Sequence, residues 1–177
     1  MGAESRERES ASVADALARY RPVLRLDPPA TLDGGDVIRA GRCLFVGRSS
    51  RTNGEAINQL ARVLEPYGYE VASVPVSGAL HLKSAAAFLG GAAMLVNPAW
   101  VDVTPFVGFE LVPADAAEPW GASALKAGET LVMAAGFPRT VGALRARGLD
   151  VREIDLSELR KAEGGPTCLS ILLTDGA

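Results

Sequence analysis

The chain of 177 residues has only two cysteines, Cys43 and Cys168, and one histidine, His81. Two cysteines cannot form a disulfide framework, and the sequence contains neither a Cys-x-x-Cys pair nor a Cys/His cluster with the spacing of a zinc site. We therefore expect no metal centre, and we expect a protein of a reducing compartment, the cytoplasm.

Long apolar runs and clustered basic residues are also missing. Met1 is followed by a charged segment where a signal peptide needs an apolar one, and no run approaches the length of a membrane span. The formal net charge is -3 and the isoelectric point is about 5.3. Nucleic-acid binding requires clustered cations that release counterions, so we expect neither nucleic acid nor a membrane as a partner.

The chain has enough hydrophobic residues to form one core. Hydrophobic residues make up 48% of the chain, and no linker or low-complexity segment divides it, so we expect one domain over residues 1–177. Stripes of helical spacing alternate with short β-rich runs, as is typical of an α/β protein. The predicted elements are a helix from Ser5 to Arg21, strands at 23–26, 36–39 and 43–47, a helix around 57–64, strands at 69–76 and 131–134, a helix at 138–147, and strands at 149–154 and 167–173.

The order strand, strand, helix, strand recurs along the chain. Gly68-Tyr69-Glu70-Val71 and Gly148-Leu149-Asp150-Val151 both follow a predicted helix and both open a strand, eighty residues apart. This distance leaves room for one comparable unit, at 80–113, and indicates a period of about forty residues. Such periods indicate propellers or solenoids. The expected fold class is therefore α/β, with about three repeated ββαβ units, a leading helix and a closing strand.

Cys168 follows Gly164-Gly165-Pro166, so a pliable loop delivers it to the mouth of the last predicted strand. Alternation along that strand places Leu169 and Ile171 on one face, which we expect to be the core, and Cys168 on the other. Residues that loops deliver to strand ends are common catalytic positions. A free cysteine is, however, usually a small buried hydrophobe, and local spacing leaves both interpretations open.

His81 lies in Leu80-His81-Leu82-Lys83, where alternation places His81 and Lys83 on one polar face. Imidazole is the side chain whose ordinary pKa suits proton transfer in both directions near neutrality. If the protein is an enzyme that uses a catalytic histidine, His81 is the one candidate in this chain. The alternative is that His81 has a structural role.

Two further polar segments suit a site but are weak signals alone. Asp33-Gly34-Gly35-Asp36 places two carboxylates around glycines that allow close backbone approach, which suits a site wall and equally an ordinary turn. Arg51 lies in a polar loop before a helix. A guanidinium at this position can bind a substrate carboxylate through two hydrogen bonds, or it can be a solvated loop charge.

Taken together and in this order, these segments resemble the dimethylargininase (dimethylarginine dimethylaminohydrolase) family. The likeness covers nearly the whole chain and is looser over residues 97–129. The family belongs to a guanidine-modifying superfamily whose pentein-type fold is a propeller-like ring of five ββαβ units, which agrees with the repeat. The matching segments are GAESR at 2–6, LDGGD at 32–36, SSRTN at 49–53, HLKS at 81–84 and TC at 167–168.

The resemblance implies hydrolysis of an Nω-methylated arginine to citrulline and dimethylamine through a covalent thiouronium intermediate. By this resemblance Cys168 is the nucleophile, His81 the general acid/base, and Asp33 the carboxylate that orients the histidine. No cofactor is implied, the partner is the small-molecule substrate, and a homo-oligomer is left open. The residues implied to bind substrate are Arg6, Arg51 and, through its backbone, Ala162.

The sequence departs from the family at its beginning. In the family a further stretch precedes the GAxSR segment and carries a Phe-x-Glu-Asp-like run whose carboxylates hold the substrate guanidinium. No such run occurs here, so we expect a chain shortened at its N-terminus. A fragment is favoured over a chain that a partner completes and over a non-catalytic binding module, because Cys168, His81 and Asp33 are all in place. Arginine deiminase and amidinotransferase chemistry are alternatives within the superfamily.

Overall fold

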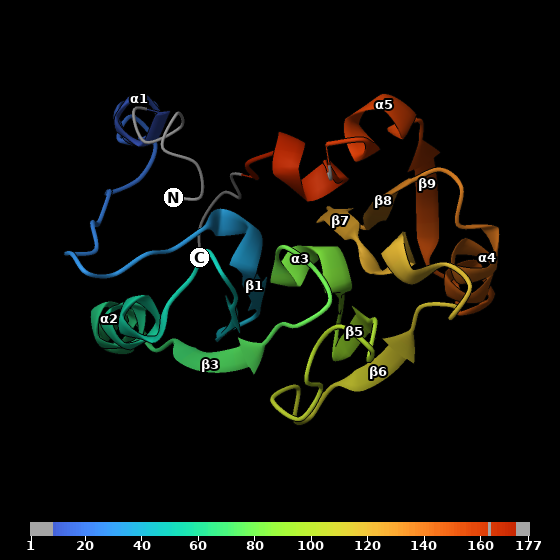
Figure 1. Cartoon of the computed structure of the whole chain (residues 1–177), viewed down its shortest axis with the longest axis horizontal. Coiled ribbons are helices and arrows are strands. Elements are labelled where there is room, and N and C mark those ends of the chain that lie inside the picture. The colour runs from blue at the N-terminus through green and yellow to red at the C-terminus, as the bar shows by residue number, and fades with distance from the viewer. Residues whose placement is uncertain (1–8, 163, 173–177) are drawn as a thin grey trace.

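The computed structural model describes residues 9–162 and 164–172 of the chain. Its strands form three sheets of three strands each, and each sheet has the same topology (Figure 1). The first two strands form an antiparallel hairpin, and the third strand is parallel to the second. The sheets comprise β1 (Val37–Ala40), β2 (Cys43–Arg48) and β3 (Glu70–Pro75); β4 (Ala86–Gly90), β5 (Ala93–Val96) and β6 (Glu110–Pro113); and β7 (Ala124–Ala127), β8 (Thr130–Ala134) and β9 (Asp150–Ile154).

Parallel strands need a crossover connection, and a helix supplies it in the first and third units. α2 (Gly54–Leu64) joins β2 to β3, and α4 (Pro138–Ala146) joins β8 to β9. Asn53 caps α2, because its side chain accepts a hydrogen bond from the backbone N–H of Ala56 at 2.9 Å. Both helices lie where the apolar spacing predicts them.

The forty-residue repeat predicted from the sequence is confirmed, since β3, β6 and β9 begin at Glu70, Glu110 and Asp150. The middle unit has a loop, residues 97–109, in place of the crossover helix. Pro98 and Pro105 lie in that loop, and each removes a backbone donor and disfavours helix in the residue before it. The predicted α/β class with repeated ββαβ units is thus confirmed, with a helix-free crossover in the middle unit.

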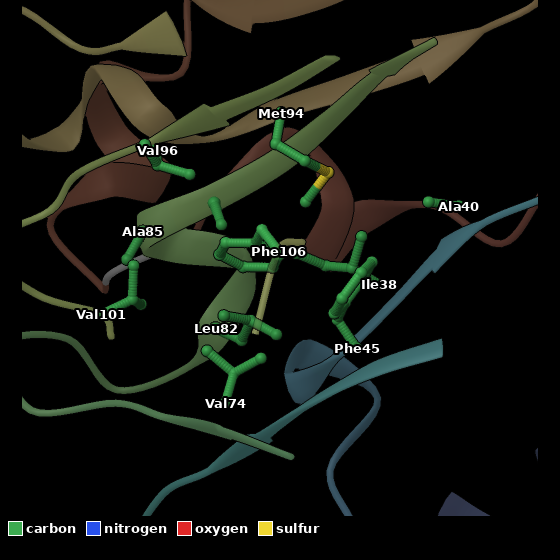
Figure 2. Packing of buried hydrophobic residues seen from close by; sticks show 11 residues of the cluster. Ile38, Ala40, Phe45, Val74, Leu82, Ala85, Met94, Val96, Val101 and Phe106 are labelled. Atoms are coloured by element: carbon green, nitrogen blue, oxygen red, sulfur yellow. The ribbon is translucent and has the colours of Figure 1, made fainter. Parts of the chain in front are cut away.

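Buried apolar side chains join the three units. β4 contacts β1 on one side and β7 on the other, while α2 and α4 lie at opposite ends of the molecule (Figure 1). One cluster fills the space between the first and second units. Figure 2 shows Phe106 beside Ile38 and Phe45, and the rings of Phe45 and Phe106 lie 4.8 Å apart. A second cluster, which includes Leu95 and Leu131, joins the second unit to the third.

The predicted first helix is observed as α1 (Glu9–Leu17), which buries none of its residues, and its expected cap, Ser5, lies outside the described residues. The strand predicted at 23–26 is wrong. These residues form no strand, and the Leu24 side chain is 56% exposed. Without a neighbouring strand the backbone groups of an extended segment find no partners, so β-rich composition alone does not make a strand.

The closing strand predicted at 167–173 is also wrong. Pro166–Leu169 form a 3-10 turn, and Ile171, which we expected in the core, is 63% exposed. Pro166 sets the backbone φ at the first position of that turn, which favours the turn over an extended start. Position 173 lies outside the described residues.

Within residues 9–162 and 164–172, no helix has both the length and the apolar character needed to cross a bilayer. The expectation of one domain over residues 1–177 stays a prediction.

Candidate active site

A cavity of about 510 Å³ opens where four parts of the chain meet. These parts are the 3-10 turn Gly34–Asp36, the start of α3 (Leu82–Ala85), the third unit between Trp120 and Phe137, and the segment that runs from α5 (Ser157–Arg160) to Cys168. In Figure 1 the C-terminal segment, drawn in red, lies across from α3. His81 and Cys168 both line the cavity, so the structure brings together the predicted acid/base and the predicted nucleophile, 87 positions apart in sequence.

His81 is the N-cap residue of α3, with extended backbone angles of φ -138° and ψ 156°. The alternation at 80–83 does not correspond to a strand, because a helix begins at Leu82. Leu82 is fully buried and anchors this start in the core. His81 and Lys83 nevertheless line the same cavity, as the sequence predicts, because they lie on either side of the buried Leu82.

Asp33 lies behind His81, with its Oδ2 3.3 Å from His81 Nε2. Nε2 is buried and has no well-aligned hydrogen-bond partner among the described residues, so the contact is electrostatic in this geometry. Burial would raise the pKa of Asp33, but the Gly35 N–H that it accepts at 2.9 Å and the neighbouring His81 together hold that pKa below its ordinary value. Asp33 is thus kept as a carboxylate beside the imidazole of His81.

The His81 ring packs directly on the glycine pair. A Cβ at Gly35 would lie 2.7 Å from His81 Cγ, whereas a Cβ at Gly34 would meet nothing within 4 Å. Gly35 is therefore required by close approach of the imidazole to the backbone, and Gly34 is not. The motif is therefore both a turn directly before β1 and, through Gly35, part of the cavity wall.

Lys83 ties the same turn to α3 from the other side. Its Nζ donates a hydrogen bond to the Gly34 carbonyl at 2.9 Å. Burial lowers the pKa of Lys83, while Cys168 and the carboxylates of Asp33 and Asp36 raise it in opposition.

Cys168 reaches the cavity on a 3-10 turn and not at a strand end. Its backbone N–H donates to the Gly165 carbonyl at 3.1 Å, and the residue is exposed. The preceding glycines pass close to their neighbours. A Cβ at Gly164 would lie 2.9 Å from the Leu159 carbonyl oxygen, and one at Gly165 would lie 2.9 Å from Ser123 Oγ. The Gly-Gly-Pro segment therefore delivers an accessible thiol, as predicted, by a different local structure.

The third unit supplies an aromatic wall that no sequence pattern predicts. Trp120 and Phe137 line the cavity together with Arg160. The Arg160 guanidinium lies 4.8 Å from the centre of the Phe137 ring, a cation–π geometry. These residues come from separate segments, and neither a motif nor a spacing in the sequence links them to His81 or Cys168.

Neither of the two predicted substrate-binding residues that the structure describes lines the cavity. Arg51 lies on the loop beside Asp33, which feels its charge, but it is not among the residues that line the cavity. Ala162 is exposed on the turn that follows the cavity residue Lys161. Arg6 lies outside the described residues. In the part of the chain that the structure describes, no three His, Cys, Asp or Glu side chains lie close enough together to hold a metal ion.

This arrangement can perform nucleophilic catalysis with proton transfer. Cys168 and His81 line one cavity, so the thiol and the imidazole can reach one substrate molecule, and Asp33 can stabilise the imidazolium. The aromatic wall can cover the apolar part of that molecule.

No family model matches the chain. It is 41% identical over 177 residues to the N(G),N(G)-dimethylarginine dimethylaminohydrolase of Streptomyces coelicolor, a match that covers 98% of this chain and 67% of that protein. It is 33% identical over 172 residues to the protein of the same name from Pseudomonas aeruginosa, covering 96% of this chain and 68% of that one. The chain thus spans about two thirds of the length of these curated relatives.

The fold is likewise similar to a solved structure of the Pseudomonas aeruginosa enzyme, a cysteine-to-serine variant complexed with citrulline. The two superpose with a TM-score of 0.86 at 32% sequence identity, over 93% of this chain and 65% of that one. The arc of three ββαβ units therefore corresponds to part of that larger structure.

Proposed function

Because the chain belongs to the dimethylarginine dimethylaminohydrolase family, we propose that it hydrolyses the guanidinium C–N bond of an Nω-methylated arginine, forming citrulline and a methylated amine. The observation that best supports this proposal is the shared cavity, in which Cys168 and His81 face the same space while Asp33 contacts His81.

The reaction proceeds in two halves. The Cys168 thiolate attacks the central guanidinium carbon, and the methylated amine leaves with a proton from His81, so that a thiouronium remains on sulfur. His81 then takes a proton from water, the resulting hydroxide adds to the same carbon, and the C–S bond breaks to release citrulline and regenerate the thiolate. Because Nε2 faces Asp33, Nδ1 is the nitrogen that exchanges protons with the amine and the water.

The remaining assignments follow from the family resemblance. Arg51 and Arg6 hold the amino-acid end of the substrate, and the backbone of Ala162 contacts it. A cytoplasmic location belongs to the same proposal. Since the chain spans about two thirds of its relatives' length, turnover by the chain as it stands is also a proposal.

Assaying the chain with asymmetric dimethylarginine and with plain arginine tests the function. We expect citrulline and dimethylamine in equal amounts from the first substrate and slower citrulline release from the second. Preference for plain arginine would assign deiminase chemistry, and transfer of the amidino group to an added amine would assign amidinotransferase chemistry.

Acid-quenched samples analysed by intact-protein mass spectrometry test the covalent step separately. We expect the thiouronium adduct on the wild-type chain and none on Cys168→Ser. A protein that only binds its ligand would show neither turnover nor adduct, and that result would reject the proposal for this chain.

A further inference from the structure

We propose that Asp36 is a positioning residue of this site, whose single buried carboxylate holds His81, Asp33 and the Arg51 loop (residues 49–52) in a fixed relation. The inference rests on the proposed function only for its effect on turnover. The arrangement of the residues can be tested without it.

The first carboxylate oxygen fixes the residue next to His81. Asp36 Oδ1 accepts a hydrogen bond from the backbone N–H of Leu82 at 2.9 Å. His81 occupies the N-cap position of α3, but its side chain makes no capping hydrogen bond. Asp36 thereby supplies the acceptor that a helix start needs, and the His81 ring is free to face the cavity.

The second carboxylate oxygen fixes the Arg51 loop. Asp36 Oδ2 accepts hydrogen bonds from the hydroxyls of Ser49 and Thr52, each at 2.7 Å. Ser49 Oγ in turn accepts from the backbone N–H of Arg51 at 3.0 Å. Thr52 Oγ1 accepts from the backbone N–H of Asp33 at 3.1 Å. Each hydroxyl accepts a hydrogen bond from a backbone N–H and donates one to Asp36, so the network has one consistent direction.

The carboxylate form of Asp36 suits this network because all three of its partners are donors. An ionised carboxylate only accepts hydrogen bonds, whereas an amide in its place would present donor hydrogens to one of them. Asp36 is fully buried, and a Cβ at Gly47 would lie 2.7 Å from its Oδ1 and 2.8 Å from Leu82 Cβ. Strand β2 therefore lies directly against the Asp36–Leu82 contact, which leaves little freedom to rearrange.

Glu118 provides a matched control for a purely structural role. It is also buried, at 8% exposure, and its two carboxylate oxygens accept from the backbone N–H groups of Arg139 and Thr140 at 2.9 and 2.8 Å. It thus holds the start of α4 as Asp36 holds the start of α3. Its hydrogen bonds reach none of the residues predicted to catalyse or to bind substrate.

The test follows the side-chain NMR signal of His81, the one histidine of the untagged chain. Ring signals would be compared in the wild type, Asp36→Asn, Thr52→Val and Glu118→Gln, with thermal unfolding recorded for each. Thr52→Val keeps the shape of the side chain while removing the hydroxyl between Asp36 and Asp33. We expect the His81 ring signals to move in Asp36→Asn and Thr52→Val and to stay in place in Glu118→Gln, even if all three unfold at lower temperature.

In the enzyme assay, Asp36→Asn should lower kcat roughly tenfold to a hundredfold, because a small displacement of a reacting group has that effect. Its KM should also rise, since the Arg51 loop loses its anchor. Unmoved His81 signals in Thr52→Val would overturn the proposal, and this variant decides the matter if Asp36→Asn fails to fold. An equal shift in Glu118→Gln would overturn it as well. If the wild type shows no turnover, the proposed function fails while the NMR comparison still decides the role of Asp36.

Discussion

The two sides of the cavity are built differently. On the His81 side, the imidazole packs on Gly35, and the adjacent Leu82 is fully buried with its N–H bound to a buried carboxylate. On the Cys168 side, an exposed residue lies on a single 3-10 turn that is closed by a hydrogen bond to Gly165. His81 is thus placed by contacts between distant segments, and Cys168 is placed by a local turn.

This difference indicates a division between a preformed half and an adjustable half. Segments held by local hydrogen bonds open at a lower free-energy cost than segments held by buried long-range contacts. We therefore expect the geometry of His81, Asp33 and Gly35 to persist without ligand, and the final placement of Cys168 to depend on what occupies the cavity. Substitutions on each side can test this division separately.

Replacing Cys168, the proposed nucleophile, should produce the largest effect on activity and almost none on stability. We expect Cys168→Ala to lower citrulline release by roughly 1000-fold or more, because no other side chain replaces a covalent nucleophile. The free energy of unfolding should change by less than about 0.5 kcal/mol, since the residue is exposed. Parallel activity and urea-unfolding measurements check both. A large loss of stability would show that the Cys168 side is not merely a local turn.

The carboxylate behind His81 should have the next largest effect. Asp33→Asn removes the charge that stabilises the imidazolium, and we expect kcat to fall roughly 100-fold with a smaller change in KM. Steady-state kinetics with dimethylarginine measure both parameters. An unchanged kcat would remove Asp33 from the mechanism and leave it a turn residue.

The same variant has a signature in the pH dependence of stability. The pKa of Asp33 is lowered in the folded chain, so its ionisation contributes stability that is fully present above the ordinary carboxyl pKa and is lost as pH falls through the lowered value. The difference in unfolding free energy between the wild type and Asp33→Asn should therefore shrink as pH falls below about 4. If this difference stays constant across the acidic range, the Asp33 carboxylate is not stabilised by Gly35 and His81 in the folded chain.

The contrast between the two sides also explains which features the sequence predicts. α2 is predictable because Ile57, Leu60 and Leu64 form a stripe of helical spacing, which is a local pattern. In the structure these three residues pack in one cluster. The closing strand is not, because alternation at 167–173 resembles a strand only if another strand lies beside it, and none does among the described residues.

The residues of the site divide in the same way, into those that sequence motifs predict and those that only the fold brings together. Local spacing is compatible with a structural or a catalytic role for both Cys168 and His81, and the resemblance of the ordered motifs to a family predicts that they act as a pair. Asp36 and Trp120 acquire their positions from contacts across the fold. No spacing within the sequence encodes such contacts. The hydrogen-bond network of Asp36 and the aromatic wall of the cavity are therefore visible in the structure and not in the sequence.

The two neighbouring glycines sharpen the comparison on the preformed side. In Gly35→Ala the new methyl group would meet the His81 ring at 2.7 Å, so we expect a loss of about 1–3 kcal/mol in unfolding free energy and roughly tenfold in kcat. Gly34→Ala adds the same methyl group where nothing lies within 4 Å, and should stay within about 0.5 kcal/mol of the wild type. Chemical unfolding and kinetics of the pair test this. Equal effects of the two substitutions would show that the His81 ring does not rest on Gly35.

The other cysteine is expected to have no effect on activity, which reverses the behaviour of Cys168. Cys43 is half-buried at the start of β2 and packs against the cluster between the first two units. Cys43→Ser places a hydroxyl in this apolar setting, so we expect a loss of about 1 kcal/mol or less in unfolding free energy and no change in kcat or KM. The thiouronium adduct should still form on this variant, because its sulfur takes no part. Loss of turnover in a folded Cys43→Ser chain would mean that the exposed turn does not hold the nucleophile, and the division between the two sides of the cavity would then have to be redrawn.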